Sequence, residues 1–191
     1  MITIPEHSAL LLIDVEESQE SFSEYIGEKQ EKREKYYHDH ILKVTKYFRK
    51  LGNVPIIHVI ELHRNEMVDF GRELEGAEGI HCLEKNTSFW EPTAPIEGEY
   101  VISKRRYSAF FGTDLEILLR GLKIEHLFIG GALTDICVHY TTVDAHQYGY
   151  HVHVFKEACG THSPEDVAQA ALDNIEYFQT GAIISVKDLE E

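Results

Sequence analysis

Three residues of different chemistry stand at or just after apolar runs that have the composition of buried strands. Asp14 ends the first run, Lys104 follows the third, and Cys137 lies shortly after the fourth, near the start of an expected helix. A thiol at a helix N-terminus beside an ammonium is expected to have a lowered pKa, and a carboxylate can take its proton. Each residue alone is more often structural, as a strand-end cap, a solvated charge or a small buried hydrophobe. Together they indicate a cysteine nucleophile, provided that the fold joins their strand ends.

The elements that must position these residues alternate along the chain. Helices are expected over 37–51, where apolar residues recur every three or four positions, and over 113–120 and 136–147. Ser163 and Pro164 mark the start of a fourth helix, with the serine as its cap. Strands that alternate with helices predict an α/β fold, a doubly wound six-stranded parallel sheet with helices on both faces. The expected strands are 8–14, 54–60, 99–103, 125–130, 150–155 and 181–185.

Residues 61–98 do not follow this alternation. The stretch has little periodicity and contains four glycines. It is far longer than a usual connection between elements, and connections of this length are commonly functional or disordered. We therefore expect it to contribute to a binding site or to lack regular structure.

The composition fits one globular domain that spans residues 1–191. The formal charge of -15 repels nucleic acid and anionic lipid, so neither is expected as a partner. Three cysteines without C-x-x-C spacing indicate a reducing compartment, and no signal peptide or membrane-spanning run is present in the sequence. No glycine-rich nucleotide motif occurs either. These features predict a cytoplasmic protein.

Four segments carry a further signal, and they are residues 9–14, 103–110, 131–138 and 157–166. In this order they resemble the isochorismatase-like cysteine hydrolases, a family that includes nicotinamidases, N-carbamoylsarcosine amidohydrolases and ureidoacrylate amidohydrolases. The resemblance implies that Asp14 is the base, Lys104 the activating lysine and Cys137 the nucleophile. It also implies a cis peptide bond between Ala132 and Leu133, which would direct the N–H of Leu133, together with that of Cys137, into an oxyanion hole.

The presence of Cys137 favours one reaction within this family. True isochorismatases, as the resemblance has it, lack the nucleophile and hydrolyse a vinyl ether. A cysteine hydrolase that cleaves a C–N bond of a small amide or ureido compound, through an acyl-enzyme, is therefore expected. The alternatives are a redox thiol protein, a non-catalytic or regulatory binding member of the family, and a metal-assisted enzyme of the nicotinamidase type. Family members commonly pair, so a homodimer or homotetramer is expected.

A metal site is the weaker of two interpretations of the segment after the second strand. Nicotinamidases hold a divalent metal with an Asp-x-His pair and a later His-Cys, and Glu61, His63 and His81 occupy the corresponding places. One carboxylate and two imidazoles suit zinc or iron. The favoured interpretation is that these side chains hydrogen-bond to backbone or substrate, so we expect no cofactor.

Four further residues are candidates for substrate binding. Glu16 stands where the family commonly has an amide side chain after its first aspartate. Trp90 lies in the long connection, Tyr107 and Phe110 follow the expected strand 99–103, and these aromatic side chains could form the wall of a pocket. The alternative for each ring is packing in the core. The identity of the amide is beyond the sequence.

Overall fold

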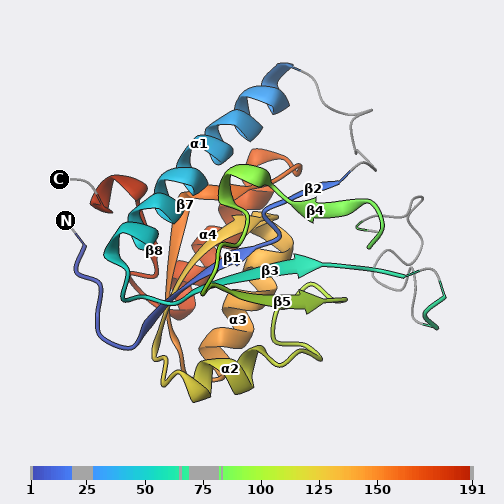
Figure 1. Ribbon diagram of the computed structural model, residues 1–191. Coiled ribbons are helices and arrows are strands. Elements are labelled where there is room, and N and C mark those ends of the chain that lie inside the picture. Colours follow the sequence, from blue (N-terminus) through green and yellow to red (C-terminus); the bar gives the residue numbers. More distant parts are fainter. Residues whose placement is uncertain (1, 19–27, 65, 69–81, 83, 190–191) are drawn as a thin grey trace.

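Six parallel strands form the central sheet, in the order β5-β3-β1-β6-β7-β8 (Figure 1). The structure is a computed structural model that describes residues 2–18, 28–64, 66–68, 82 and 84–189. Every neighbouring pair in this sheet is parallel, so the predicted α/β class is confirmed. The strands are β1 (Ser8–Ile13), β3 (Ile56–Glu61), β5 (Tyr100–Lys104), β6 (His126–Ala132), β7 (His151–Gly160) and β8 (Ile183–Ile184).

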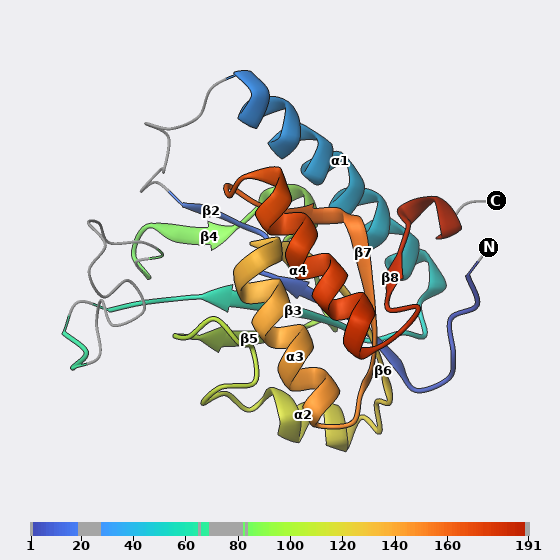
Figure 2. The same ribbon diagram turned by 180° about the vertical axis from the view of Figure 1, so that it is seen from behind.

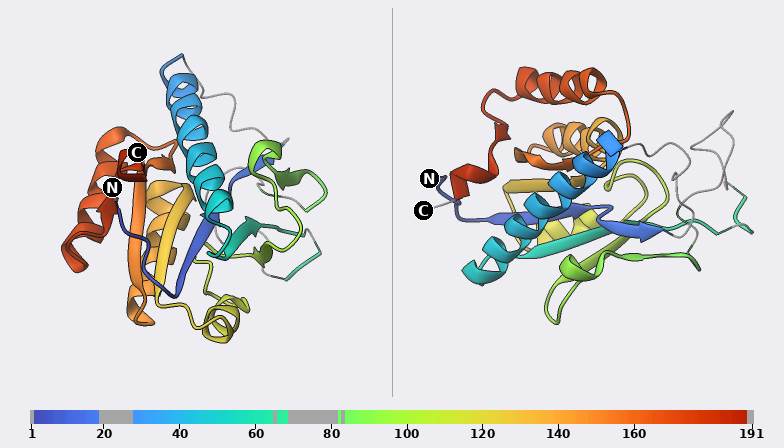
Figure 3. Two further views of the ribbon diagram at one scale, coloured as in Figure 1. Left: turned by 60° about the vertical axis from the view of Figure 1, so that its left-hand side comes forward. Right: turned by 90° about the horizontal axis from the view of Figure 1, so that it is seen from above.

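Helices cover both faces of the sheet, as the alternation of elements predicted. α1 (Glu28–Leu51) lies over one face (Figure 1). α3 (His139–Gln147) and α4 (Glu165–Phe178) lie over the other face, where α2 (Leu115–Gly121) also packs (Figure 2). The view from above shows α3 and α4 together on one side of the strands (Figure 3). The sheet is thus the middle of three layers.

The central strand β1 shows why this arrangement follows from its composition. Its side chains alternate between the two layers: Leu10 and Leu12 pack with the residues of α1, whereas Ala9, Leu11 and Ile13 pack with those of α2, α3 and α4. All six residues of the strand are buried. A strand covered on both faces needs a continuous apolar run, and that run is what the sequence contains.

The first helix begins earlier than its apolar stripe predicted. Ile41, Val44 and Phe48 of that stripe are completely buried, but α1 starts at Glu28 rather than at Tyr37. The residues over 31–36 are mostly charged and exposed. A helical turn that buries no apolar side chain leaves no periodic signal in the sequence.

A second, two-stranded sheet lies at the end of the molecule to which the carboxyl ends of the strands point (Figure 1). It pairs β2 (Glu16–Ser18) with β4 (Thr87–Phe89) in antiparallel register, and a 3-10 turn, η3 (Glu91–Thr93), follows. The connection 61–98 therefore contains regular structure in part, although most of its middle lies outside the described residues. Strands of three residues are too short for a recognisable alternation.

Two expectations about helix starts were wrong. Ser163 does not cap α4, because its hydroxyl donates to Asp135 Oδ2 at 2.7 Å and Pro164 precedes the helix without a side-chain cap. The helix expected over 136–147 is divided: a five-residue π-helical turn, η4 (Thr134–Val138), comes before α3. π-turns within helices are often found at functional sites, and this one contains Cys137.

Within the described ranges, the longest helix is too polar to be a membrane-spanning segment, and no other helix meets the length and apolarity that a span requires. The cytoplasmic location stays a prediction.

Candidate active site

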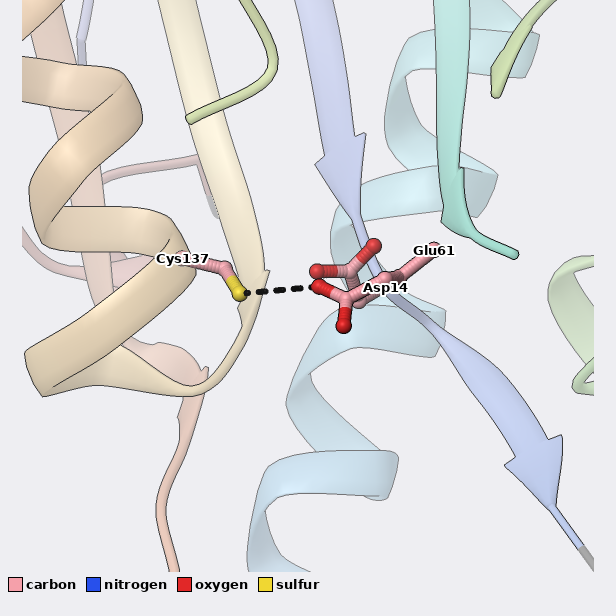
Figure 4. A group of neighbouring side chains, drawn as sticks. All are labelled: Asp14, Glu61 and Cys137. Atoms are coloured by element: carbon pink, nitrogen blue, oxygen red, sulfur yellow. Dashed lines mark hydrogen bonds between the residues drawn. The ribbon is translucent and has the colours of Figure 1, made fainter. Parts of the chain in front are cut away.

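The carboxyl ends of three adjacent strands bring the polar residues together. β5, β3 and β1 are neighbours, so Lys104 at the end of β5, Glu61 at the end of β3 and Asp14 just after β1 lie side by side. Glu61 and Lys104 are direct partners in the register. Cys137 approaches from η4, which follows β6 on the other side of β1 (Figure 4). This is the edge at which parallel sheets bind ligands.

The local backbone geometry at the end of β1 allows Asp14 to lie close to the other site residues. Asp14 has a φ of 49°, in the left-handed region that aspartate tolerates better than most residues, and its N–H donates to the carbonyl of Val59 at 3.0 Å. Next to it, a Cβ on Gly131 would lie 1.9 Å from the carbonyl oxygen of Ile13. Only glycine therefore allows β6 to pass β1 at this distance.

Lys104 is the centre of the group. Its ammonium lies 2.8 Å from Asp14 Oδ2, 2.5 Å from Glu61 Oε2 and 3.4 Å from Cys137 Sγ. The side chain is completely buried. Burial acts to lower the pKa of Lys104, but the neighbouring Asp14, Cys137 and Glu61 raise it well above its usual value. The lysine is therefore a fixed positive charge.

Cys137 differs from the sequence expectation of a lowered thiol pKa. Burial is the largest effect and raises the pKa of Cys137 well above its usual range; Asp14 and Glu61 add to the rise, and Lys104 opposes it. The positive end of a helix and one ammonium do not outweigh two carboxylates in a dry site. The expectation of a resting thiolate is thus wrong. The sulfur is a thiol that donates to Glu61 Oε2 at 3.7 Å (Figure 4).

Asp14 has the ionisation that a proton acceptor needs near neutral pH. Burial raises its pKa to about 6, an effect that Lys104 reduces and Glu61 reinforces. A base with a pKa just below the working pH is deprotonated and still takes a proton readily. The structure therefore brings a carboxylate, a cation and a thiol into one group. One carboxylate oxygen of Asp14, one of Glu61 and the sulfur of Cys137 all lie within 4.8 Å of one another.

Glu16 lies next to this group and is in a different protonation state. Burial, followed by the charge of Asp14, raises its pKa to about 8, so it is neutral at pH 7. Its Oε1 accepts from the thiol of Cys82 at 3.0 Å. Among the described residues, no partner contacts its buried Oε2 or the buried hydroxyl of Tyr37. A substrate contact of Glu16 stays a prediction.

The aromatic candidates have packing contacts. Phe110 is buried in the core and stacks on Tyr148 with ring centroids 5.2 Å apart, and its role in a pocket wall stays a prediction. Tyr107 meets Tyr140 edge to face at 5.5 Å. Trp90 stacks on His38 of α1 at 4.3 Å. A substrate contact of Tyr107 or Trp90 stays a prediction.

The residues proposed for a metal form hydrogen bonds instead of an open ligand set. His63 Nε2 lies 2.9 Å from Glu61 Oε1, and the other oxygen of Glu61 is taken up by Lys104. His81 lies outside the described residues. The space among Asp14, Glu61 and Cys137 is occupied by the ammonium of Lys104, whose charge would repel a cation. The described residues therefore do not fit a metal ion.

The remaining predicted residue, Leu133, follows β6 directly. The peptide bond between Ala132 and Leu133 is cis. The carbonyl of Leu133 accepts the N–H groups of Ile136 and Val138, which closes the turn that carries Cys137. An oxyanion hole made by the N–H groups of Leu133 and Cys137 stays a prediction.

Sequence reasoning missed the place of Glu61 in this group. It considered Glu61 only together with His63 and His81, either as a metal ligand or, as the favoured interpretation, as a hydrogen-bond partner of backbone or substrate. The signal that selected Asp14 and Lys104, a polar residue at the end of an apolar strand, was equally present at Glu61. Applied uniformly, that signal predicts all three.

Comparison with known proteins gives consistent results. Residues 8–188, which include all the site residues described above, match the family model named Isochorismatase domain. The chain is 32% identical over 136 residues to an uncharacterised isochorismatase family protein, PncA, of Bacillus subtilis, and this match covers 68% of the chain and 74% of the relative.

Two further similarities concern proteins with named activities. The chain is 40% identical over 84 residues to the ureidoacrylate amidohydrolase RutB of Yersinia enterocolitica, a match that covers 44% of the chain and only 36% of that longer protein. The crystal structure of a pyrazinamidase/nicotinamidase from Streptococcus mutans superposes with a TM-score of 0.77 at 26% identity, over 93% of this chain and 99% of the other.

Proposed function

Because the match to its domain spans almost the whole length, the chain belongs to the isochorismatase family, and on that premise we propose that it is a cysteine hydrolase that cleaves a C–N bond of a small amide or ureido compound. The family and the hydrolase class agree with the sequence prediction. One observation carries the proposal of a thiol mechanism: Cys137 Sγ lies 3.4 Å from Lys104 Nζ, which is bound in turn to Asp14 at 2.8 Å.

The mechanism begins with a neutral thiol. As substrate binds, Asp14 accepts the Cys137 proton and the sulfur attacks the carbonyl carbon of the amide. Lys104 and the N–H groups of Leu133 and Cys137 stabilise the negative charge on the tetrahedral oxygen. The carbon–nitrogen bond then breaks, the amine or ammonia leaves with the proton from Asp14, and a thioester remains.

Hydrolysis of the thioester completes the cycle. Asp14, deprotonated again, takes a proton from water, and the resulting hydroxide attacks the acyl carbon. Sulfur leaves, accepts the proton and returns to the resting thiol. Lys104 keeps its positive charge throughout, because the carboxylates around it hold its pKa high.

The substrate is proposed to be a small molecule with N–H groups. Glu16 Oε2 and Asp14 Oδ1 are buried oxygens without hydrogen-bond partners among the described residues. Asp14 is acceptor-only when ionised, so an amide or ureido nitrogen complements it. The ureidoacrylate and nicotinamide activities named for two relatives fall in this class, although their matches leave the particular amide open.

The test is a screen of amides and ureido compounds for ammonia release, followed by variants. On any active compound, Cys137→Ser should lose most turnover, and Asp14→Asn should lower kcat by about 100-fold to 10,000-fold. Lys104→Ala should mainly lower kcat. Lack of turnover on the whole panel, while a thiol reagent still labels Cys137, would support a non-catalytic binding member instead.

A further inference from the structure

Asp14, Glu61, Lys104 and Cys137 form a buried group that we call the thiol centre. Glu61 is the carboxylate of this group that the mechanism above does not use. The residue is 3% exposed. Its Oε2 contacts Lys104 Nζ at 2.5 Å and accepts the Cys137 thiol at 3.7 Å, while its Oε1 lies 2.9 Å from His63 Nε2. A carboxylate that touches both the cation and the nucleophile belongs to the reacting group.

The strand register fixes this position. Glu61 and Lys104 are paired residues of β3 and β5, so neither can withdraw without a change in the sheet. His63 holds the far oxygen of Glu61, which leaves Oε2 directed at Lys104 and Cys137. Figure 4 shows the carboxyl groups of Glu61 and Asp14 side by side, facing the sulfur.

We propose that Glu61 is a working member of the thiol centre: its Oε2 holds the Cys137 thiol as a hydrogen-bond donor in the resting protein and, with Asp14, takes the thiol proton in turnover. In that step the S–H bond breaks and an O–H bond forms on one carboxylate. The electron pair stays on sulfur for the attack, and the proton later leaves on the amine. The turnover part rests on the proposed function, whereas the resting state does not require a substrate.

Charge supports this role. With the thiol neutral, the ionised carboxylates of Asp14 and Glu61 exceed the single ammonium of Lys104 by one negative charge. Among the described residues, the charged groups that act most strongly on the thiol are these three, from the ends of β1, β3 and β5, and Glu16 on β2 is protonated at neutral pH because its pKa is raised to about 8. Removal of Glu61 charge therefore favours the thiolate, because a like charge near the sulfur disfavours its ionisation.

The test is alkylation of Cys137 by iodoacetamide in the full-length protein, measured site by site with peptide mass spectrometry from pH 6 to pH 10. Glu61→Gln keeps the shape and a hydrogen-bond acceptor but removes the charge. Because the pKa of Cys137 lies well above its usual value, the alkylation rate should rise with pH across this window without levelling off. At the separations found here, Glu61→Gln should lower that pKa by at least about one unit, so the rate at each pH below it, pH 8 included, should rise at least about tenfold. The matched control is Glu84→Gln, an exposed carboxylate, which should leave the profile unchanged.

A second variant and an internal monitor guard against misfolding. Glu61→Asp keeps the charge but withdraws the carboxyl group by one methylene, so a smaller shift in the same direction is expected. Burial raises the pKa of Cys159 to about 12, so this thiol should stay unlabelled near neutral pH in every folded variant. An unchanged or slower alkylation profile in folded Glu61→Gln would overturn the proposal.

Turnover provides a separate outcome. On an active amide, Glu61→Gln should move the acid limb of kcat to lower pH, because loss of its charge lowers the pKa of Asp14. If the wild-type protein hydrolyses no amide but Glu61→Gln still changes the alkylation profile, the proposed function fails. The proposed hydrogen bond from the Cys137 thiol to Glu61 in the resting protein is then still supported. An acid limb that does not move in Glu61→Gln would contradict the charge coupling of Glu61 to Asp14, on which the part of Glu61 in turnover depends.

Discussion

Replacement of Glu16 by glutamine should stabilise the protein at alkaline pH. Burial and the charge of Asp14 raise the pKa of Glu16 from 4.5 to about 8. The folded state therefore binds a proton that the unfolded chain releases above pH 4.5. Stability attributed to this group is complete below pH 4.5 and is lost progressively as pH rises to about 8. Glutamine does not titrate, so Glu16→Gln avoids that loss.

The size of the effect follows from the pKa difference. At about 1.4 kcal/mol for each pH unit, a rise from 4.5 to about 8 corresponds to an upper value of about 5 kcal/mol. This is a large part of the 5–15 kcal/mol that stabilises a typical domain. The isosteric amide keeps the acceptor for the Cys82 thiol, which now contacts Glu16 Oε1 at 3.0 Å.

The assay is urea unfolding of both proteins at intervals from pH 5 to pH 9. The difference in unfolding free energy should be small at pH 5, grow steadily and level off above pH 8. Glu17→Gln is the matched control, because its side chain is exposed on the same short strand. Parallel stability curves for the wild-type protein and Glu16→Gln would refute a buried, protonated carboxyl group at this position.

Three other outcomes are expected. Gly131→Ala should cost more than about 3 kcal/mol in urea unfolding, since its Cβ would lie 1.9 Å from the Ile13 carbonyl, whereas Gly181→Ala, also at positive φ but in open space, should cost about 1 kcal/mol. Turnover on an active amide should survive dialysis against EDTA; loss that zinc or iron restores would show a metal site. Sedimentation at micromolar concentration should show a dimer or tetramer, because Phe111, which precedes α2, and Ile117 of α2 are 67% and 72% exposed, and a 22.0 kDa species alone would contradict this.

The layers of the fold could be predicted because a buried face requires apolar residues at regular positions in the sequence. The continuous apolar run of β1 is buried on both faces of the sheet, and the apolar stripe of α1 is buried against one of them. Elements that bury little have no such pattern, which is why the charged start of α1 and the short strands β2 and β4 were not predicted. The Ser163 cap was wrong for a different reason: Asp135, distant in sequence, competes for the hydroxyl.

The group formed by Asp14, Lys104 and Cys137 was predicted from strand ends and from a family resemblance, yet its electrostatics were not. A lowered thiol pKa follows if one ammonium and a helix end are the only neighbours. The structure adds burial, which is the largest effect and raises the thiol pKa, and a second carboxylate, Glu61, which raises it further. Burial depth and cross-strand register are properties of the assembled sheet, so short sequence motifs do not contain them.

The two glutamates of the site are connected by the same charge balance. Asp14 and Glu61 already exceed the charge of Lys104, so a third ionised carboxylate within the same buried space would be opposed by both. Glu16 therefore occupies the place of an amide by staying protonated, and a neutral carboxyl group, like an amide, has one donor and one acceptor side. Burial, which is the largest effect, and the charges of Asp14 and Glu61 act together to keep the proton on Glu16, so all three permit a carboxyl group at this position to remain neutral.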